Sequence, residues 1–217
     1  MVNDRRYKAP PIVEAVFECQ FSESVSERQT EKVISKIKKN YSSLSLQRRA
    51  SAHVNMSDKQ VKFEDVSAPR LTSDDQADVF IFYPDSIIWA KLAPYAGGDN
   101  FIDRIMRDFE ILKSVCGLRK LNRLGLRYIN RIDVPRSGVV VNYEDYITIN
   151  LSLPNELDPV NSYGWSFERP FAESNMLAKV QSASMMPEIP NTMAFLLDID
   201  IIAQSDLPVK LPDLRLK

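Results

Sequence analysis

The segment LRKLNRLGLRYINRIDV, residues 118–134, decides the fold of this chain. Arginines recur at every fourth position of it, at Arg119, Arg123, Arg127 and Arg131. Because the side chains of a strand alternate between two faces, this even spacing places all four arginines on one face. The opposite face then carries the apolar residues Leu118, Leu124, Leu126, Tyr128, Ile132 and Val134. The same spacing also fits a helix face, but Gly125 and the tyrosine, isoleucine and valine content favour a strand.

Composition narrows the class of protein. With 217 residues, 44% hydrophobic and 26% charged, the chain is long and apolar enough to bury a sizeable core. A net charge of -1 argues against a generally basic nucleic-acid binder, although a local stripe of arginines can still bind phosphates. Cys19 and Cys116 lie among apolar residues, which predicts buried, reduced thiols. No apolar run is long enough to span a membrane and the N-terminal residues lack a signal-peptide pattern, so we expect a cytoplasmic protein without membrane association.

Hydrophobic periodicity predicts the order of the elements. Alternation predicts a strand over 12–21, and Ser26 with Gln29 predicts a capping box for a helix over 26–40. A second helical stripe runs from Phe101 to Cys116 and ends at Gly117. Further strands are expected over 44–56, 60–66, 77–83, 87–92, about 171–185 and 192–203, the last two divided by the turn MMPEIPN. Between them, Asn142 and Asp145 predict the cap of a short helix, and residues 155–170 predict a long loop.

This order predicts an α+β fold, with a mainly antiparallel curved sheet and two principal helices packed on one face. We expect residues 1–217 to form a single domain. Two intertwined halves, about 1–84 and 85–217, are the alternative, and the order is also compatible with a loosely duplicated β-α-β-β unit, although no residue-level repeat supports it.

Three stretches carry a resemblance to a known family. YKAPPIVEAVFE at residues 7–18, GLRYINRID at residues 125–133 and LDID at residues 197–200 together resemble a sporadically distributed, uncharacterised bacterial protein family. The resemblance implies no particular activity. By association alone, the patchy distribution of the family implies a gene cluster of the phage-defence or toxin–antitoxin type.

Motifs for catalysis and cofactors are missing from the sequence. It contains no P-loop, no G-x-G-x-x-G and no G-x-S-x-G. The single histidine, His53, has no second histidine or paired cysteines nearby to complete a zinc site. Gly97 and Gly98 precede a helix, where a turn explains them better than a phosphate site does. We therefore expect no catalytic residues, no metal and no cofactor, and the enzyme class stays open with a preference for a non-enzyme.

One set of charged residues is a candidate binding site. Its acids are Glu14 and Glu18 on the first strand and Asp198 and Asp200 on the last, and they share the polar face predicted for Arg119, Arg123, Arg127 and Arg131. A solvated outer face with cross-strand ion pairs explains this pattern most simply. A groove that holds an anion or a charged partner is the alternative. Asn130 interrupts the apolar face, so if it is buried it requires hydrogen-bond partners.

Three functions remain open from the sequence. The preferred hypothesis is a non-enzymatic protein-binding scaffold or regulator, which acts on a protein partner or as a homo-oligomer. The second is nucleic-acid binding, in which Arg48, Arg49, Lys120 and Arg136 join the arginine stripe; few aromatic residues accompany these arginines, which gives base stacking little support. The third is a metal-dependent phosphoesterase that uses the four acids, whose spacing matches no known motif.

Overall fold

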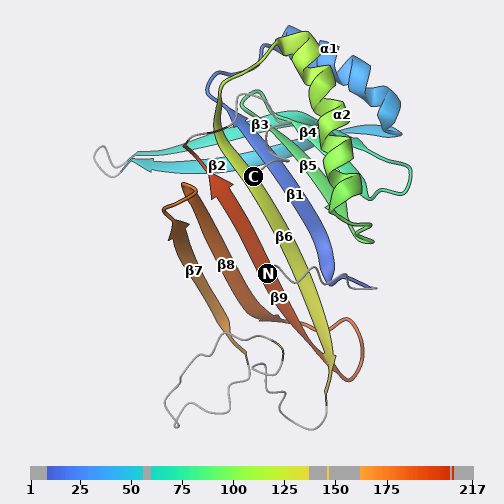
Figure 1. Ribbon diagram of the computed structural model, residues 1–217, viewed down its shortest axis with the longest axis vertical. Coiled ribbons are helices and arrows are strands. Elements are labelled where there is room, and N and C mark those ends of the chain that lie inside the picture. The colour runs from blue at the N-terminus through green and yellow to red at the C-terminus, as the bar shows by residue number, and fades with distance from the viewer. Residues whose placement is uncertain (1–8, 56–59, 137–145, 147–161, 206, 208–217) are drawn as a thin grey trace.

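The computed structural model describes residues 9–55, 60–136, 146, 162–205 and 207, with the backbone alone for residues 51–55 and 60–64 (Figure 1). The first half contains β1 (Ile12–Phe21), α1 (Glu27–Ile37), the 3-10 turn η1 (Lys38–Asn40), β2 (Ser43–Asn55), β3 (Gln60–Thr72), β4 (Asp78–Phe82) and β5 (Ser86–Leu92). The second half contains α2 (Gly98–Cys116), β6 (Leu121–Pro135), β7 (Gly164–Phe171), β8 (Met176–Met185) and β9 (Thr192–Ala203).

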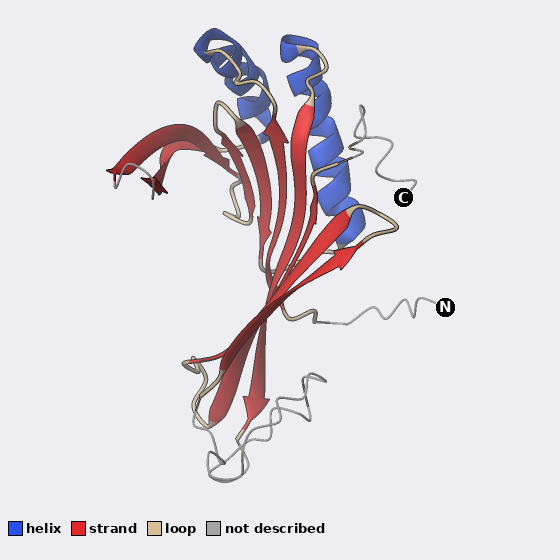
Figure 2. Cartoon of the chain, turned by 90° about the vertical axis from the view of Figure 1, so that its left-hand side faces the viewer, coloured by secondary structure: helices blue, strands red, loops and turns tan. Residues whose placement is uncertain are grey.

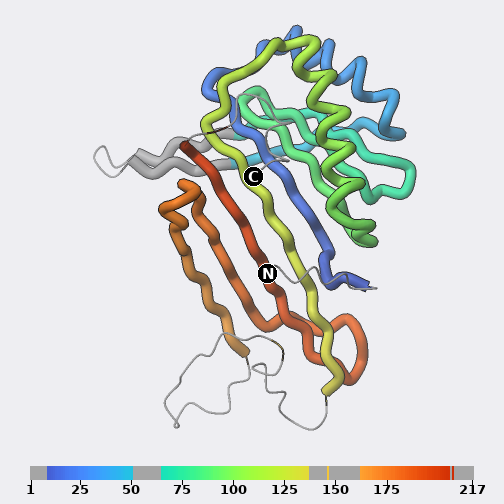
Figure 3. Tube along the Cα trace, in the orientation of Figure 1, coloured from blue at the N-terminus to red at the C-terminus, as the bar shows by residue number. Residues whose placement is uncertain are grey.

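The nine strands form one open antiparallel sheet in the order β2-β3-β4-β5-β1-β6-β9-β8-β7. β1 and β6 lie side by side at its centre, although they are far apart in the sequence, and β9 follows on the other side of β6 (Figure 3). The sheet is strongly curved and twisted, and both helices are near one end of it (Figure 2). The prediction of an α+β fold with a curved antiparallel sheet is confirmed.

The main core lies between the two helices and the strands from β3 to β6. Alternate residues of β1, among them Ala15 and Cys19, point into it, and α1 contributes Val33, Ile34 and Ile37. The predicted capping box of α1 is present, since the side chains of Ser26 and Gln29 each accept a hydrogen bond from the backbone N–H of the other residue. The α-helix ends at Ile37, and a 3-10 turn follows it to Asn40.

A second, smaller core occupies the distal part of the sheet. Phe195 and Val134 are buried there, and Ile132, Tyr163, Trp165 and Met193 pack against them. Phe195 shares the apolar face of the sheet with Phe17 and Leu126, so alternation alone predicts that all three pack together against α2. That prediction is wrong, because the twist of the long strands carries the lower half of β6 and β9 away from the helix layer (Figure 2).

Several predicted boundaries also need correction. Residues 164–170, predicted as loop, form β7, and the strand predicted over 171–185 is β8 preceded by the turn of a hairpin. β3 extends to Thr72, six residues beyond the predicted end at Val66. Cys19 is buried as predicted, but Cys116 is only half-buried. The short helix predicted at Asn142 and Asp145 lies outside the described residues.

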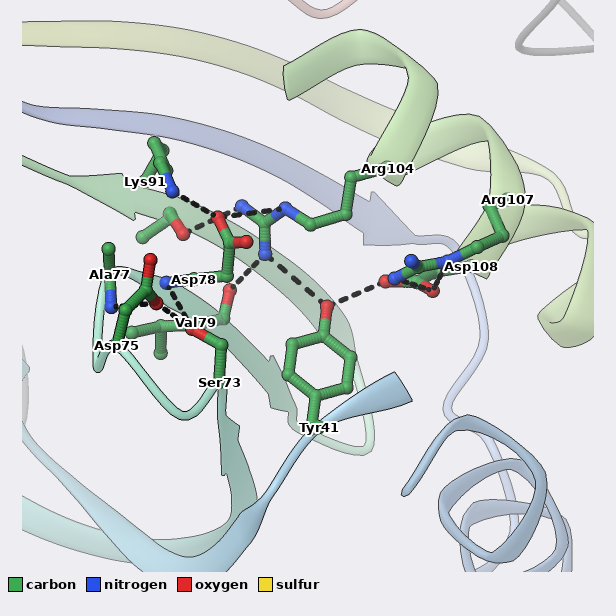
Figure 4. A network of polar contacts seen from close by, with 11 residues as sticks. Tyr41, Ser73, Asp75, Ala77, Asp78, Val79, Lys91, Arg104, Arg107 and Asp108 are labelled. Carbon is green, nitrogen blue, oxygen red and sulfur yellow. Dashed lines mark hydrogen bonds and ion pairs between the residues drawn. The ribbon is translucent and has the colours of Figure 1, made fainter. Parts of the chain in front are cut away.

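A buried polar network ties α2 to the sheet (Figure 4). The Arg104 guanidinium donates to the carbonyl oxygens of Val79 and Ala90 at 3.2 and 2.7 Å and to the Tyr41 hydroxyl at 3.3 Å. Tyr41 in turn donates to the fully buried Asp108 carboxylate at 2.7 Å. Burial, together with Asp108, raises the pKa of the Tyr41 hydroxyl, so it remains a protonated donor. The network therefore fixes the position of α2 over β4 and β5.

Candidate functional site

The charged face of the sheet forms as the alternation predicts, with one exception. Arg123, Arg127 and Arg131 lie on the face of β6 opposite the helices, while Leu124, Leu126 and Tyr128 pack into the main core. Arg119 precedes the strand, which begins at Leu121, and its guanidinium donates to Ser24 and Gln29 near the start of α1. Leu118 also lies before the strand and is exposed. The arginine stripe therefore has three members, because the chain turns between α2 and β6 before alternation begins.

Register brings the predicted acids to these arginines. Asp200 of β9 lies opposite Arg127, and Asp198 lies opposite Ile129. Arg127 reaches diagonally to Asp198 and donates two hydrogen bonds, Nε to Oδ1 at 2.8 Å and Nη2 to Oδ2 at 2.5 Å. The hydrogen bond to Asp198 raises the pKa of Arg127. Since the Asp198 side chain is only 7% exposed, Arg127 serves first to neutralise a buried carboxylate.

A second group of ion pairs forms around Arg123, four residues before Arg127 on β6. Arg123 pairs with Glu18 of β1, and its Nη2 lies 3.5 Å from Oδ2 of Asp200. Burial raises the pKa of the Asp200 carboxyl even though Arg123 and Arg127 lower it. The guanidinium of Arg123 lies across Gly125, where a Cβ atom would come within 3.1 Å of Nη1. Gly125 thus leaves the space through which Arg123 reaches acids on both neighbouring strands, a role that strand propensity did not reveal.

The structure also places the other predicted site residues, Arg131, Asn130 and Glu14. Arg131 pairs with Asp133 of its own strand at 2.9 Å and with Glu188 of the β8–β9 turn at 2.7 Å. Asn130 is buried and donates to the Leu197 carbonyl at 3.0 Å, so its predicted need for a partner is confirmed. Glu14 of β1 lies opposite Ile129 of β6, and its negative charge helps to raise the pKa of Arg127.

This arrangement limits what the charged face can do chemically. The four predicted acids outnumber Arg123 and Arg127, and each of these two guanidinium groups already has a carboxylate partner. A phosphate would have to displace these partners from an acidic surface, which costs affinity. Among the residues that the structure describes, no group of three or more His, Cys, Asp or Glu is arranged to hold a metal ion.

The opposite face of the sheet carries an apolar groove that was not predicted from the sequence. The α2 groove, as we name it, has a volume of about 340 Å³ and lies between α2 and the strands β1, β6, β9 and β8. Its lining is Phe101, Ile102, Ile105 and Met106 of α2 with Phe17, Leu124, Gly125, Leu126, Tyr128, Met176, Ile201 and Ala203 of the sheet. Ile102 is 38% exposed although it is large and apolar. No residue of this lining carries a charge, so the groove suits an apolar surface.

Comparison with known proteins adds no assignment, because no family model and no curated protein matches the chain. No helix in the described part of the chain is both long enough and apolar enough to cross a membrane.

Proposed function

We propose that this protein is a protein-binding scaffold, and that the α2 groove receives an amphipathic helix of a partner protein. The observation that carries the proposal is the uncharged lining of the groove, in which Ile102 is exposed and Leu126 and Met176 are only partly buried. Exposed apolar patches of this kind mark interaction surfaces in soluble proteins.

Geometry favours a helix as the occupant. The floor of the groove spans the neighbouring strands β1, β6, β9 and β8, which at about 4.8 Å between strands gives a width of roughly 14 Å, wide enough for a helix of about 10–12 Å diameter. α2 forms one wall and already packs lengthwise on the adjacent part of the same face. A docked helix would extend this layer, and apolar residues at i, i+3, i+4 and i+7 would fill the groove.

The charged face supports protein binding over the alternatives. Its arginines are paired with carboxylates, as Arg127 is with Asp198, and this leaves little free positive charge for a nucleic acid. A metal-dependent phosphoesterase has no support from the described acids, which alternate with guanidinium groups and form no metal-binding group among the residues described.

The test uses a fluorescein-labelled helical peptide of about 18 residues, with leucines at helical spacing and equal numbers of Glu and Lys. We expect saturable binding at about 10 μM or tighter that persists at high salt. Ile102→Glu should weaken it about tenfold, because a charge enters an apolar site. Ser114→Glu places the same charge on an exposed position of α2 outside the groove, and should leave affinity unchanged.

Three outcomes would overturn the proposal. They are no saturable binding, equal affinity for the Ile102→Glu variant, and dimerisation of the protein that Ile102→Glu abolishes. The last would assign the groove to a second copy of the chain. Tight, salt-sensitive binding of DNA or RNA that is lost in Arg127→Ala would instead favour the nucleic-acid hypothesis.

A further inference from the structure

A second groove lies between α1 and the edge strand β2. This strand ends the sheet order, and in the described part of the chain it is hydrogen-bonded on one side only, to β3. The β2 groove, as we name it, has a volume of about 550 Å³. Its lining consists of Val25, Glu27, Thr30, Glu31 and Ile34 at α1, Leu44, Ser45 and Leu46 of β2, and Ser67, Pro69, Phe82 and Pro84.

Two leucines on the edge strand are unusually exposed. Leu44 and Leu46 lie opposite Leu71 and Pro69 of β3, and because they are two positions apart they point to the same face. Their exposed fractions are 53% and 73%. Most proteins protect such an edge with charges, prolines or a covering element, because its free N–H and C=O groups recruit other strands. Residues 43–47, SLSLQ, contain neither a charge nor a proline.

The facing wall of the groove is acidic. Glu27 and Glu31 are one turn apart on α1, and both line the groove. Neither carboxylate has an ion-pair partner among the described residues. An apolar floor with two unpaired carboxylates on one side complements a ligand that carries both apolar and basic side chains.

We propose that the free edge of β2 beside this groove binds an extended segment of a partner protein whose groove-facing residues are apolar and basic in turn. The segment would add to β2 as a further strand, with its backbone bonded to the free edge from Ser43 to Gln47. Because alternate side chains of a strand point to opposite faces, only every second residue of the segment would face Leu44, Leu46 and α1. The apolar residues among these would pack on Leu44 and Leu46, and the Lys or Arg residues would pair with Glu27 and Glu31. This mode combines backbone affinity with side-chain specificity. The site is additional to the α2 groove, because the strands that line it are β2, β3 and β4, whereas those that line the α2 groove are β1, β6, β9 and β8, with β5 between the two sets.

The probe is a labelled peptide of about eight residues, blocked at both ends, in which one set of alternate positions carries valine and lysine in turn and the other set carries threonine. We expect it to bind the full chain saturably, and a peptide of equal length with glutamate in place of lysine to bind far more weakly. The double variant Glu27→Gln/Glu31→Gln should weaken the lysine peptide about tenfold, since two ion pairs are lost. Glu23→Gln/Glu173→Gln makes the same change in net charge at exposed positions outside the groove and should leave the affinity unchanged.

A third peptide, N-methylated at alternate residues, tests strand addition because it lacks half of the backbone donors. It should lose most of the affinity. Equal affinity for the methylated and unmethylated peptides would refute strand addition, and equal losses in the two double variants would refute the acidic wall. Ile102→Glu should leave this binding intact, so failure at the β2 groove can be told apart from failure of the proposed α2 groove.

Discussion

Replacement of Arg104 by methionine tests whether the buried polar network holds α2 in place. The side chain of Arg104 is only 7% exposed, and its guanidinium bonds two strand carbonyls and the Tyr41 hydroxyl. Methionine keeps most of the apolar stem, so the loss is chiefly that of the charged donor. Removal of one member of a buried charged network costs roughly 3–5 kcal/mol, because its partners are left unsatisfied. For a chain of this length that predicts a fall in Tm of roughly 6–20 °C.

Urea unfolding followed by circular dichroism measures this free energy directly. Lys113→Met is the matched control, because it removes a cation from the same helix whose Nζ lies 3.2 Å from Glu110 at the surface. A surface pair of this kind contributes at most about 1 kcal/mol. If Arg104→Met lowers the free energy of unfolding no more than Lys113→Met does, the network does not hold the helix, and the reasoning from burial fails.

Four further predictions concern other parts of the molecule. Asp198→Asn should lower the free energy of unfolding by about 1 kcal/mol in urea melts, since the Arg127 guanidinium loses its carboxylate partner. Burial raises the pKa of Asp200, so this carboxyl stabilises the fold fully below its unfolded-state pKa of 3.8, and that stabilisation is lost as the pH rises through the folded-state pKa. The urea midpoint should therefore fall between about pH 4 and 7, and Asp200→Asn should make this fall smaller. Native protein should expose Cys116 but not Cys19 to a thiol reagent, and a second thiol that reacts without unfolding would contradict the burial of Cys19. Phe195→Ala should cost roughly 3–5 kcal/mol in urea melts if the second core is cooperative with the first, and a loss below 1 kcal/mol would show that it is not.

Strand alternation made the central sheet predictable. A strand face is set by whether a residue number is odd or even, so the apolar series in β1, β6 and β9 was enough to place Arg127 and Asp198 on one surface. The ion-pair partner of each arginine was harder to predict from the sequence. Arg131 pairs with Asp133 and with Glu188, because a loop brings Glu188 close and the sequence carries no signal for that approach.

The missed features have identifiable causes. Arg104 and Asp108 are four residues apart within the apolar stripe of α2, and charged residues at this spacing were the available signal for a buried network. The β7–β8 hairpin was overlooked because its turn uses Asn175 with φ of 51° instead of glycine. The α2 groove depends on which strands the helix leaves uncovered. That follows from the twist of the whole sheet and not from any local pattern.

The central position of β1 has a consequence for how the chain folds. Both of its hydrogen-bonded neighbours come later in the sequence, since Phe17 pairs with Trp89 of β5 and with Leu126 of β6. During synthesis, β1 therefore leaves the ribosome with two open edges and waits for more than half of the chain. Sheets built from such distant pairs fold slowly, over milliseconds to seconds, and expose strands to wrong partners in the meantime. Expression at low temperature or with chaperones should therefore raise the folded yield.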